Sequence, residues 1–541
     1  MSKRVPVIKP TNPTRPRNAF DLSQKHLFTA PVGLLQPVMS LDLIPHDHVE
    51  IQADDFMRAL PMNTAAFVSL RGVYEFFFVP YSQLWHPFDQ FVTGMSDYRS
   101  SSISALYGDK SPELIPSVRL SDVFSKVAGS SAKDIFGFPA KNTMLRYMDM
   151  MGYGRSYRTD GSLPDPGGQF YYGDCSITAF RALAFQKIYS DFYRNNTYEP
   201  VDVSYFNIDN IHGASLKSDD FLRFLTPRYR NAQLDFFTNI RPKALFDFGY
   251  VPDQSFFQGD SDLTLGTVSS SVDIGINKED SGSSSFSVAD IRNAFALDKL
   301  LSVTMRSGKT YAEQVAAHFG YHVSEGRDTQ VMFIGGFDSD YQTGDVTQQS
   351  GTSITGVDKQ FGGYLGRTVG KMTGSGSGSI KFDAKEHGVL MCVYSIVPDM
   401  QYDSSRLDPF VIKNRRGNFF VPEFENLGMQ PLESVFVSAS RTSGTAHGWQ
   451  PRYSEYKTAL DINHGQFCHF EPLEYWSIGR GRSKDTLNTF NLASLKINPL
   501  WLNDVFVVNY NGSERTDQFF GGCNFRIQKV SDMSEDGMPR V

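Results

Sequence analysis

The sequence of 541 residues predicts a mainly β protein in which long connections separate the strands of one core. Aromatic residues make up 13% of the chain, and their flat rings fit the pleated, half-buried surface of a sheet. The 45 glycines and 27 prolines favour turns and long connections over helices. The helical patterns do not alternate regularly with strands, which disfavours a doubly wound parallel sheet.

The clearest strand pattern covers residues 67–80. Its sequence, FVSLRGVYEFFFVP, alternates at first, then becomes continuously apolar and stops at Pro80. A continuous apolar run is expected where both faces of a strand are buried. Residues 20–95 as a whole are predicted to be extended. Further strands are predicted at 388–397, 466–470, 504–510 and 519–527.

Three helices are predicted, at 176–195, 288–301 and 311–319, because apolar residues recur there at helical spacing after a polar capping residue. In the first helix, Ser176 is the expected N-cap. The third helix is expected to end at Gly320, a residue type that suits the left-handed C-terminal cap.

Two tracts rich in Gly and Ser, 247–287 and 340–380, are predicted to be long loops, and the second ends in the alternating run Gly374–Ser379. Loops of this length are usually functional or disordered. Because 541 residues exceed what one hydrophobic core normally supports, we expect either several domains or one domain with large insertions.

Residues 1–20 form a basic arm in a chain whose net charge is −7. The arm contains no acidic residue and five basic ones: Lys3, Arg4, Lys9, Arg15 and Arg17. A proline-rich basic segment cannot fold alone and is typical of tails that bind nucleic-acid phosphates. A solvated terminus, or an arm that crosses a neighbouring subunit, explains the same pattern.

No motif predicts a catalytic, cofactor-binding or metal site. Gly366-x-x-x-Gly370-Lys371 is one residue too short for a phosphate-binding loop, and Met372 replaces the required Ser or Thr. His46, His48 and Glu50 would share one face of a strand, but a polar strand edge or a subunit contact is the favoured interpretation.

The remaining sequence features agree with an intracellularly made, non-membrane protein. The four scattered cysteines lack a paired spacing, which favours free thiols over disulfides or a zinc site. No apolar run is long enough to cross a bilayer, and the N-terminus lacks the pattern of a secretory signal.

Several short segments are together more specific than any one alone. In chain order they are Tyr74–Pro80, Arg228–Thr238, Asp290–Phe295, Ser307–Glu313, His318–Gly320, Glu386–Gly388, Pro422–Phe424, Tyr453–Tyr456 and Asp517–Phe519. Their content and order resemble the major capsid protein of the Microviridae, the small single-stranded DNA phages, and above all the gokushovirus-type branch. Ile240–Lys243 departs from the pattern, because many relatives carry a Trp-rich segment there, and this leaves the subfamily open.

The resemblance implies an eight-stranded antiparallel jelly roll over residues 21–541, with long loop insertions and a few short helices. It implies self-assembly into a T=1 icosahedral capsid around a circular single-stranded DNA genome, in a virion assembled in the host cytoplasm. It also implies a surface protrusion at the three-fold axis for attachment to a receptor on the bacterial host. By order along the chain, residues 247–287 are expected to form the protrusion, with 340–380 as the alternative.

The resemblance leaves open whether a small basic DNA-packaging protein and an internal scaffolding protein assist assembly. A carbohydrate-binding or carbohydrate-cleaving β-sandwich protein is the alternative from another functional class, because it would also be rich in aromatic residues and glycine. The lack of a secretory signal favours the structural, non-enzymatic capsid protein over a secreted lectin or hydrolase.

Overall fold

The computed structural model describes residues 17–93, 114–154, 175–211, 215–242, 299, 303, 317, 330–347, 368–403, 407–414, 416–425, 429–437, 446–468, 471–480, 492–503, 505–506 and 517–535. Several predictions fall outside these residues. They are the basic residues Lys3, Arg4, Lys9 and Arg15, the tract 247–287, and, apart from Lys299 and Ala317, the helices at 288–301 and 311–319.

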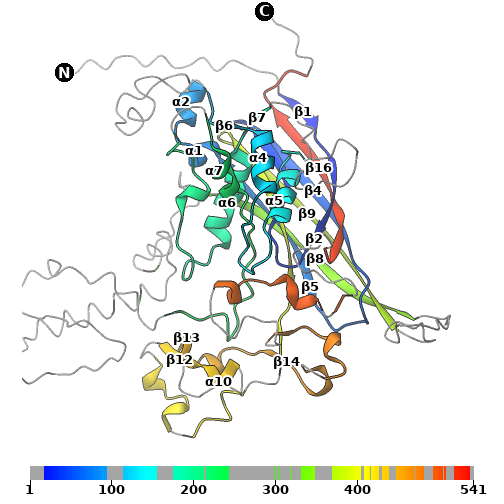
Figure 1. Ribbon diagram of the computed structural model, residues 1–541, viewed down its shortest axis with the longest axis vertical. Helices are drawn as coiled ribbons and strands as arrows, with labels where there is room; N and C mark the ends of the chain where they lie inside the picture. Colours follow the sequence, from blue (N-terminus) through cyan, green and yellow to red (C-terminus); the bar gives the residue numbers. More distant parts are fainter. Residues whose placement is uncertain are drawn as a thin grey trace, which may run out of the picture.

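One curled antiparallel sheet of nine strands dominates the structure (Figure 1). Its strands are β1 (Asn18–Asp21), β2 (Gln24–Ala30), β3 (Gln36–Leu43), β4 (His48–Ala59), β5 (Leu70–Pro80), β8 (Met332–Thr347), β9 (Thr368–Asp383), β10 (Gly388–Pro398) and β16 (Phe519–Ser531). They are hydrogen-bonded in the order β1-β16-β4-β9-β8-β5-β10-β3, and β2 also pairs with β16.

The order of the strands is that of a jelly roll. β1 lies opposite Gln528–Ser531 and β2 lies opposite Phe519–Phe525, so these two strands occupy one position along β16. Numbered along the chain, the eight resulting positions stand in the order 1-8-3-6-5-4-7-2. We call β1/β2-β16-β4-β9 the first half of the barrel and β8-β5-β10-β3 the second half. The predicted mainly β jelly-roll fold is therefore confirmed.

The two ends of the sheet approach each other and close the barrel. On β3, Gln36 donates a hydrogen bond of 3.1 Å from its Nε2 to the backbone oxygen of Thr29 on β2. Apolar side chains from both halves fill the interior, among them Phe76, Leu390 and Ile527. Because every second residue of a strand points inward, the opposite side chains form the outer surface of the barrel.

The outer face of the second half is covered by helices that all belong to the connection between β5 and β8 (Figure 1). They are α1 (Tyr81–Leu84), α2 (Phe88–Thr93), α4 (Leu120–Ala128), α5 (Lys141–Met150), α6 (Phe180–Ile188), the π-helical turn η1 (Tyr189–Tyr193), η2 (Val203–Tyr205) and α7 (Ser218–Phe224). The short strands β6 (Ser117–Arg119) and β7 (Ser176–Thr178) pair beside them. Phe77 and Val389 pack against this layer, so β5 and β10 are buried on both faces, which the apolar run at 67–80 predicted for β5.

The connection between β10 and β16 consists of short elements drawn below the barrel in Figure 1. Its strands and one helix are β11 (Gln401–Asp403), β12 (Met429–Glu433), α10 (Ser434–Val437), β13 (Ala446–Pro451), β14 (Asp461–Asn463) and β15 (Gly479–Arg480). Its 3-10 turns are η4 (Arg416–Asn418), η5 (Pro422–Phe424), η6 (Ser454–Tyr456), η7 (Gly465–Phe467), η8 (Glu474–Trp476), η10 (Leu492–Leu495) and η11 (Pro499–Leu502).

The predicted loop at 340–380 is wrong at both ends, because residues 340–347 lie in β8 and residues 368–380 lie in β9. The glycines of Gly374–Ser379 make room for aromatic rings from β8. A Cβ atom at Gly374 would lie 3.0 Å from the Cδ1 atom of Tyr341, and one at Gly378 would lie 2.6 Å from Cδ1 of Phe337. The alternating pattern therefore builds a strand, and residues 348–367 lie outside the described residues.

The helix predicted at 176–195 begins late and changes its periodicity. Ser176 is not its N-cap, because residues 176–178 form β7 and the helix begins at Phe180. At its end the backbone N–H of Arg194 donates to the oxygen of Tyr189, five residues earlier. This wider turn rotates the buried face, so Phe192 is exposed while Tyr193 is buried.

The strand predictions at 466–470, 504–510 and 519–527 have three different outcomes. Of the strand predicted at 466–470, residues 466–468 are described and are not a strand, because Gly465 adopts φ = +64° and opens the 3-10 turn η7. Of 504–510, only residues 505–506 are described, and Phe506 forms an isolated bridge with Met62. The strand at 519–527 is confirmed as part of β16. All four cysteines are free thiols, and Cys392 and Cys523 are buried.

Candidate functional site

Among the five predicted nucleic-acid contacts, only Arg17 lies in the described part of the chain, directly before β1. Its Nε atom lies 3.2 Å from a carboxylate oxygen of Asp532, and its guanidinium donates to the backbone oxygen of His46 at 2.7 Å. Arg17 therefore fastens the end of the basic arm to the edge of the first half of the barrel.

The polar segment His46–Glu50 does not converge on one point. His46, His48 and Glu50 each contact a different residue of another strand or of the C-terminal segment. Their partners are Asp532 at 2.8 Å, Asp383 at 2.7 Å and Lys381 at 3.2 Å, respectively. Across the described ranges, no group of three or more His, Cys, Asp or Glu side chains could hold a metal ion. The segment opens β4, which lies between β16 and β9, so its polar side chains pair with their neighbours in the interior of the sheet rather than along a strand edge.

The glycine motif at 366–371 is not a phosphate-binding loop in the part that the structure describes. Gly370 and Lys371 lie within β9, whereas such a loop connects a strand to a helix. A Cβ atom at Gly370 would lie 2.0 Å from the backbone oxygen of Thr64. This glycine therefore permits the close approach of two backbone segments.

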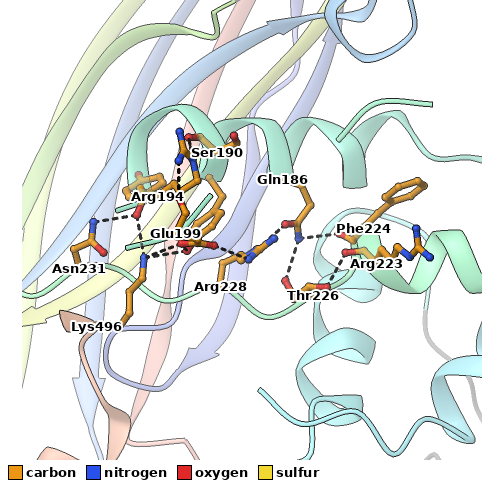
Figure 2. A network of polar contacts seen from close by, with 12 residues as sticks. Gln186, Ser190, Arg194, Glu199, Arg223, Phe224, Thr226, Arg228, Asn231 and Lys496 are labelled. Carbon is orange, nitrogen blue, oxygen red and sulfur yellow. Dashed lines mark hydrogen bonds and ion pairs between the residues drawn. The ribbon is translucent and has the colours of Figure 1, made fainter. Parts of the chain in front are cut away.

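A buried polar network joins the helical layer to the connection between β10 and β16 (Figure 2). At its centre is Lys496, whose side chain is 1% exposed. Its Nζ atom donates to the Tyr189 hydroxyl at 2.9 Å and to the backbone oxygen of Tyr193 at 3.0 Å, and it lies 4.0 Å from Glu199. Burial lowers the pKa of Lys496 to about 7.

Arg228 continues the network on the other side of Glu199 (Figure 2). It donates to the side-chain oxygen of Gln186 at 2.7 Å and to Glu199 at 3.3 Å. Its guanidinium also lies 4.3 Å from the ring centre of Tyr189 and 4.8 Å from that of Tyr205. A small cavity borders these residues. Because the cations here already have acceptors, the network is a structural junction between two long connections.

An exposed group of rings lies on the connection between β10 and β16. We call Phe410, Phe420, Phe424, Tyr453 and Tyr456 the aromatic cluster. All except Tyr453 are between 40% and 46% exposed. The ring centres of Phe410 and Tyr456 lie 5.0 Å apart, as do those of Phe420 and Tyr453. Apolar groups gathered on a surface in this way mark interaction sites.

A buried ion pair holds the aromatic cluster from below. Lys413 and Glu455 lie 2.8 Å apart, and their side chains are only 6% and 8% exposed. The Lys413 ammonium lies 4.5 Å from the ring centre of Phe410 and 4.0 Å from that of Tyr456. Burial alone would raise the pKa of Glu455, but hydrogen bonds from Lys413 and Gln430 lower it below its usual value. The exposed rings are therefore held in place before any partner binds.

Comparison with known proteins decides the class of the molecule. The family described as capsid protein (F protein) matches residues 10–157 and 254–539. The chain belongs to this capsid protein family. It is 23% identical, over 91% of its own length and 89% of the relative's, to capsid protein VP1 of Chlamydia phage 1. It is also 25% identical to capsid protein VP1 of Bdellovibrio phage phiMH2K, over 37% of each chain.

These matches confirm the predicted resemblance to the Microviridae major capsid protein, and the carbohydrate-binding alternative finds no support in them. The capsid protein has no helix, within its described residues, that is long and apolar enough to cross a membrane. Its aromatic cluster was not predicted. The rings are spaced irregularly among charged residues in the sequence, and only the fold shows that they share one surface.

Proposed function

We propose that copies of this capsid protein assemble into a T=1 icosahedral shell that encloses a circular single-stranded DNA genome. The observation that carries the proposal is the jelly-roll strand order, found in a chain that the capsid family matches over residues 10–157 and 254–539. We infer that its role is structural rather than enzymatic, since the relatives are named as capsid proteins.

The aromatic cluster is the proposed contact with a neighbouring copy. A closed shell requires complementary patches on different sides of one subunit. The segments that carry the cluster, 407–425 and 452–457, contain five basic and four acidic residues, so their charge is nearly balanced. Preorganised aromatic anchors with little net charge are typical of the energetic centre of a protein interface.

The basic arm is the proposed contact with the genome inside the shell. Arg17 is paired with Asp532, so it anchors the arm, and Lys3, Arg4, Lys9 and Arg15 are the residues proposed to contact phosphates. Deleting residues 2–16 is expected to lower the DNA content of purified particles. An unchanged DNA content would count against the arm.

Residues 247–287 are the proposed protrusion that meets a receptor on the host surface. They belong to the connection from β5 to β8, the same connection that supplies the helical layer. Residues 348–367, between β8 and β9, are what remains of the alternative at 340–380. Assembly in the host cytoplasm, with an internal scaffolding protein and a small basic DNA-packaging protein, completes the proposal.

Electron micrographs of the purified protein test the shell. The chain is expressed alone and together with the other structural proteins of the same phage, and hollow icosahedral particles are expected in at least one preparation. The double variant Phe410→Ser/Tyr456→Ser should remain folded but fail to form particles. Leu234→Ser, at an exposed leucine outside the aromatic cluster, is the matched control. A folded wild-type chain that never forms particles would overturn the proposal.

A further inference from the structure

The outer face of the first half carries a second exposed apolar group. Leu27 on β2, Phe56 on β4 and Phe520 on β16 are 75%, 50% and 41% exposed. Leu27 and Phe56 both lie opposite Gly522, and Phe520 lies two residues before this glycine. Because residues that lie opposite one another, or two apart, share a face, the three side chains stand together.

The residues that lie opposite Phe56 on the two neighbouring strands are small. Gly522 leaves no side chain between Leu27 and Phe56, and a Cβ atom there would lie 2.8 Å from the Leu27 Cδ2 atom. On the far side of β4, Phe56 lies opposite Ser375. Gly522 and Ser375 therefore place no large side chain beside Phe56 on the two neighbouring strands, and Arg58, which lies opposite Phe520, is the large neighbour of both rings.

Three basic residues of the same face surround the apolar group: Lys25, Arg58 and Lys371. We call these three residues, together with Leu27, Phe56 and Phe520, the sheet patch. The Arg58 guanidinium lies 5.0 Å from the centre of the Phe56 ring. Within the described residues, Lys25, Arg58 and Lys371 form no ion pair.

The acidic residues of this face are mostly matched. Glu50 pairs with Lys381 at 3.2 Å and Asp54 pairs with Arg526 at 2.9 Å, while Asp383 shares a hydrogen bond of 2.7 Å with His48. Asp340, opposite Ser375, is the acid of the same face that adjoins the sheet patch without an ion pair in the described residues. The sheet patch therefore has an excess of free positive charge.

We propose that the sheet patch binds single-stranded nucleic acid. Bases stack on Phe56 and Phe520, while Arg58, Lys25 and Lys371 contact the phosphates. Sequence-tolerant binding of single strands uses this combination of exposed rings and a positively charged surface. The inference rests on the proposed function, in which the shell encloses a single-stranded DNA genome, and it adds a specific surface for that genome.

Two observations favour a nucleic acid over a second copy of the chain. A protein interface here would desolvate three cations beside which Asp340 is the adjoining carboxylate without an ion pair in the described residues, a costly arrangement. In addition, the basic arm leads into β1, an edge strand of the same half of the barrel. The arm and the sheet patch therefore belong to the same half of the barrel.

Fluorescence anisotropy with a labelled 20-nucleotide poly-dT strand tests the inference. The protein is the unassembled subunit, with and without residues 2–16. The shortened subunit reports binding by the sheet patch without any contribution from the basic arm. The double variant Phe56→Ser/Phe520→Ser should weaken binding at least tenfold, as expected when stacking on two rings is lost. Lys381→Gln, on the same face but paired with Glu50, is the control and should change binding less than twofold.

Circular dichroism verifies that each variant is folded. The double variant is expected to fold, because the substituted rings are exposed and contribute little to the core. Binding to poly-dT that is unchanged in the folded double variant would overturn the inference. So would a double variant that binds normally but no longer assembles, because the face would then be a contact between copies. If the subunit binds poly-dT through the sheet patch but never forms particles, the shell proposal fails and the binding site stands.

Discussion

The aromatic cluster and the sheet patch are both exposed and apolar, but their charges are arranged differently. In the aromatic cluster, Lys413 is buried against Glu455 and its charge is neutralised beneath the rings. In the sheet patch, Arg58 stands over the Phe56 ring without an acidic partner among the described residues. Exposed rings alone therefore do not define the partner. We infer the partner from whether the neighbouring cations are paired with carboxylates: paired cations favour a protein partner, and unpaired cations favour a nucleic acid.

The two surfaces also differ in what supports them. The sheet patch stands on β2, β4 and β16, whose backbone hydrogen bonds hold the side chains in register. The aromatic cluster stands on the short turns η5 and η6 and on the irregular segments before them, and one ion pair lies beneath it. We therefore expect single substitutions to disrupt the cluster more readily than the patch.

The largest expected effect separates the two faces of the barrel wall. Phe76 is fully buried in the barrel interior, and Phe76→Ala should lower the free energy of unfolding by about 3–5 kcal/mol. Phe56→Ala, on the outer face, should lower it by less than about 1 kcal/mol. Urea denaturation of both variants measures the difference. Equal losses would mean that Phe56 supports the fold and is not kept for a ligand.

The next effect concerns the ion pair beneath the aromatic cluster. Glu455→Gln leaves the Lys413 ammonium buried without its carboxylate, which should cost about 3 kcal/mol of local stability. Hydrogen exchange should show faster exchange of the amides of η5 and η6. Glu425→Gln is the control, because its pair with Lys457 is exposed and should contribute less than about 1 kcal/mol. Similar exchange in both variants would contradict the supporting role of the buried pair.

The sequence was sufficient where the apolar pattern alone determines the element. β5 and β10 are continuous apolar runs because each packs on the barrel interior and on the helical layer, and both were predicted with nearly correct ends. β9 was missed because its glycines reflect aromatic rings contributed by β8, a contact between strands that a local pattern cannot contain. The order of the strands came from the family resemblance and not from periodicity.

The surfaces were harder to predict than the fold. Leu27, Phe56 and Phe520 come from three strands, and only the register around Gly522 brings them together. The pairing of Arg17 with Asp532 joins opposite ends of the chain, so a count of basic residues could not show that Arg17 is already engaged. The charge of the arm was predictable, whereas the pairing of each charge depends on the tertiary structure.

A smaller effect concerns the buried lysine that joins the helical layer to the connection between β10 and β16. Burial places the pKa of Lys496 at about 7 in the folded protein, below its ordinary value of 10.5. Between these two pH values the unfolded chain binds more protons than the folded protein does. Below pH 7 the folded protein bears the full cost of burying the charged ammonium, and this cost disappears as the pH rises and Lys496 loses its proton. The free energy of unfolding should therefore rise by up to about 2 kcal/mol from pH 7 to pH 9.

Lys496→Met should remove this rise, and urea denaturation at the two pH values measures it. Lys381→Met, at an exposed lysine of the outer sheet face, should retain the wild-type dependence. If Lys496→Met also retained it, Lys496 would not be the titrating group.

The smallest effect distinguishes the two surfaces by their response to salt. Binding of poly-dT to the subunit without residues 2–16 should weaken with salt, with a log–log slope of about −2, because three cations each release about 0.7 counterion on a single strand. Arg58→Gln should reduce the slope by about 0.7. Assembly through the aromatic cluster should depend little on salt in the same range, because its central charge pair is buried and poorly screened. Light scattering measures assembly at the same salt concentrations as the anisotropy titration. Equal salt slopes for DNA binding and for assembly would mean that charge does not distinguish the partners of the two surfaces.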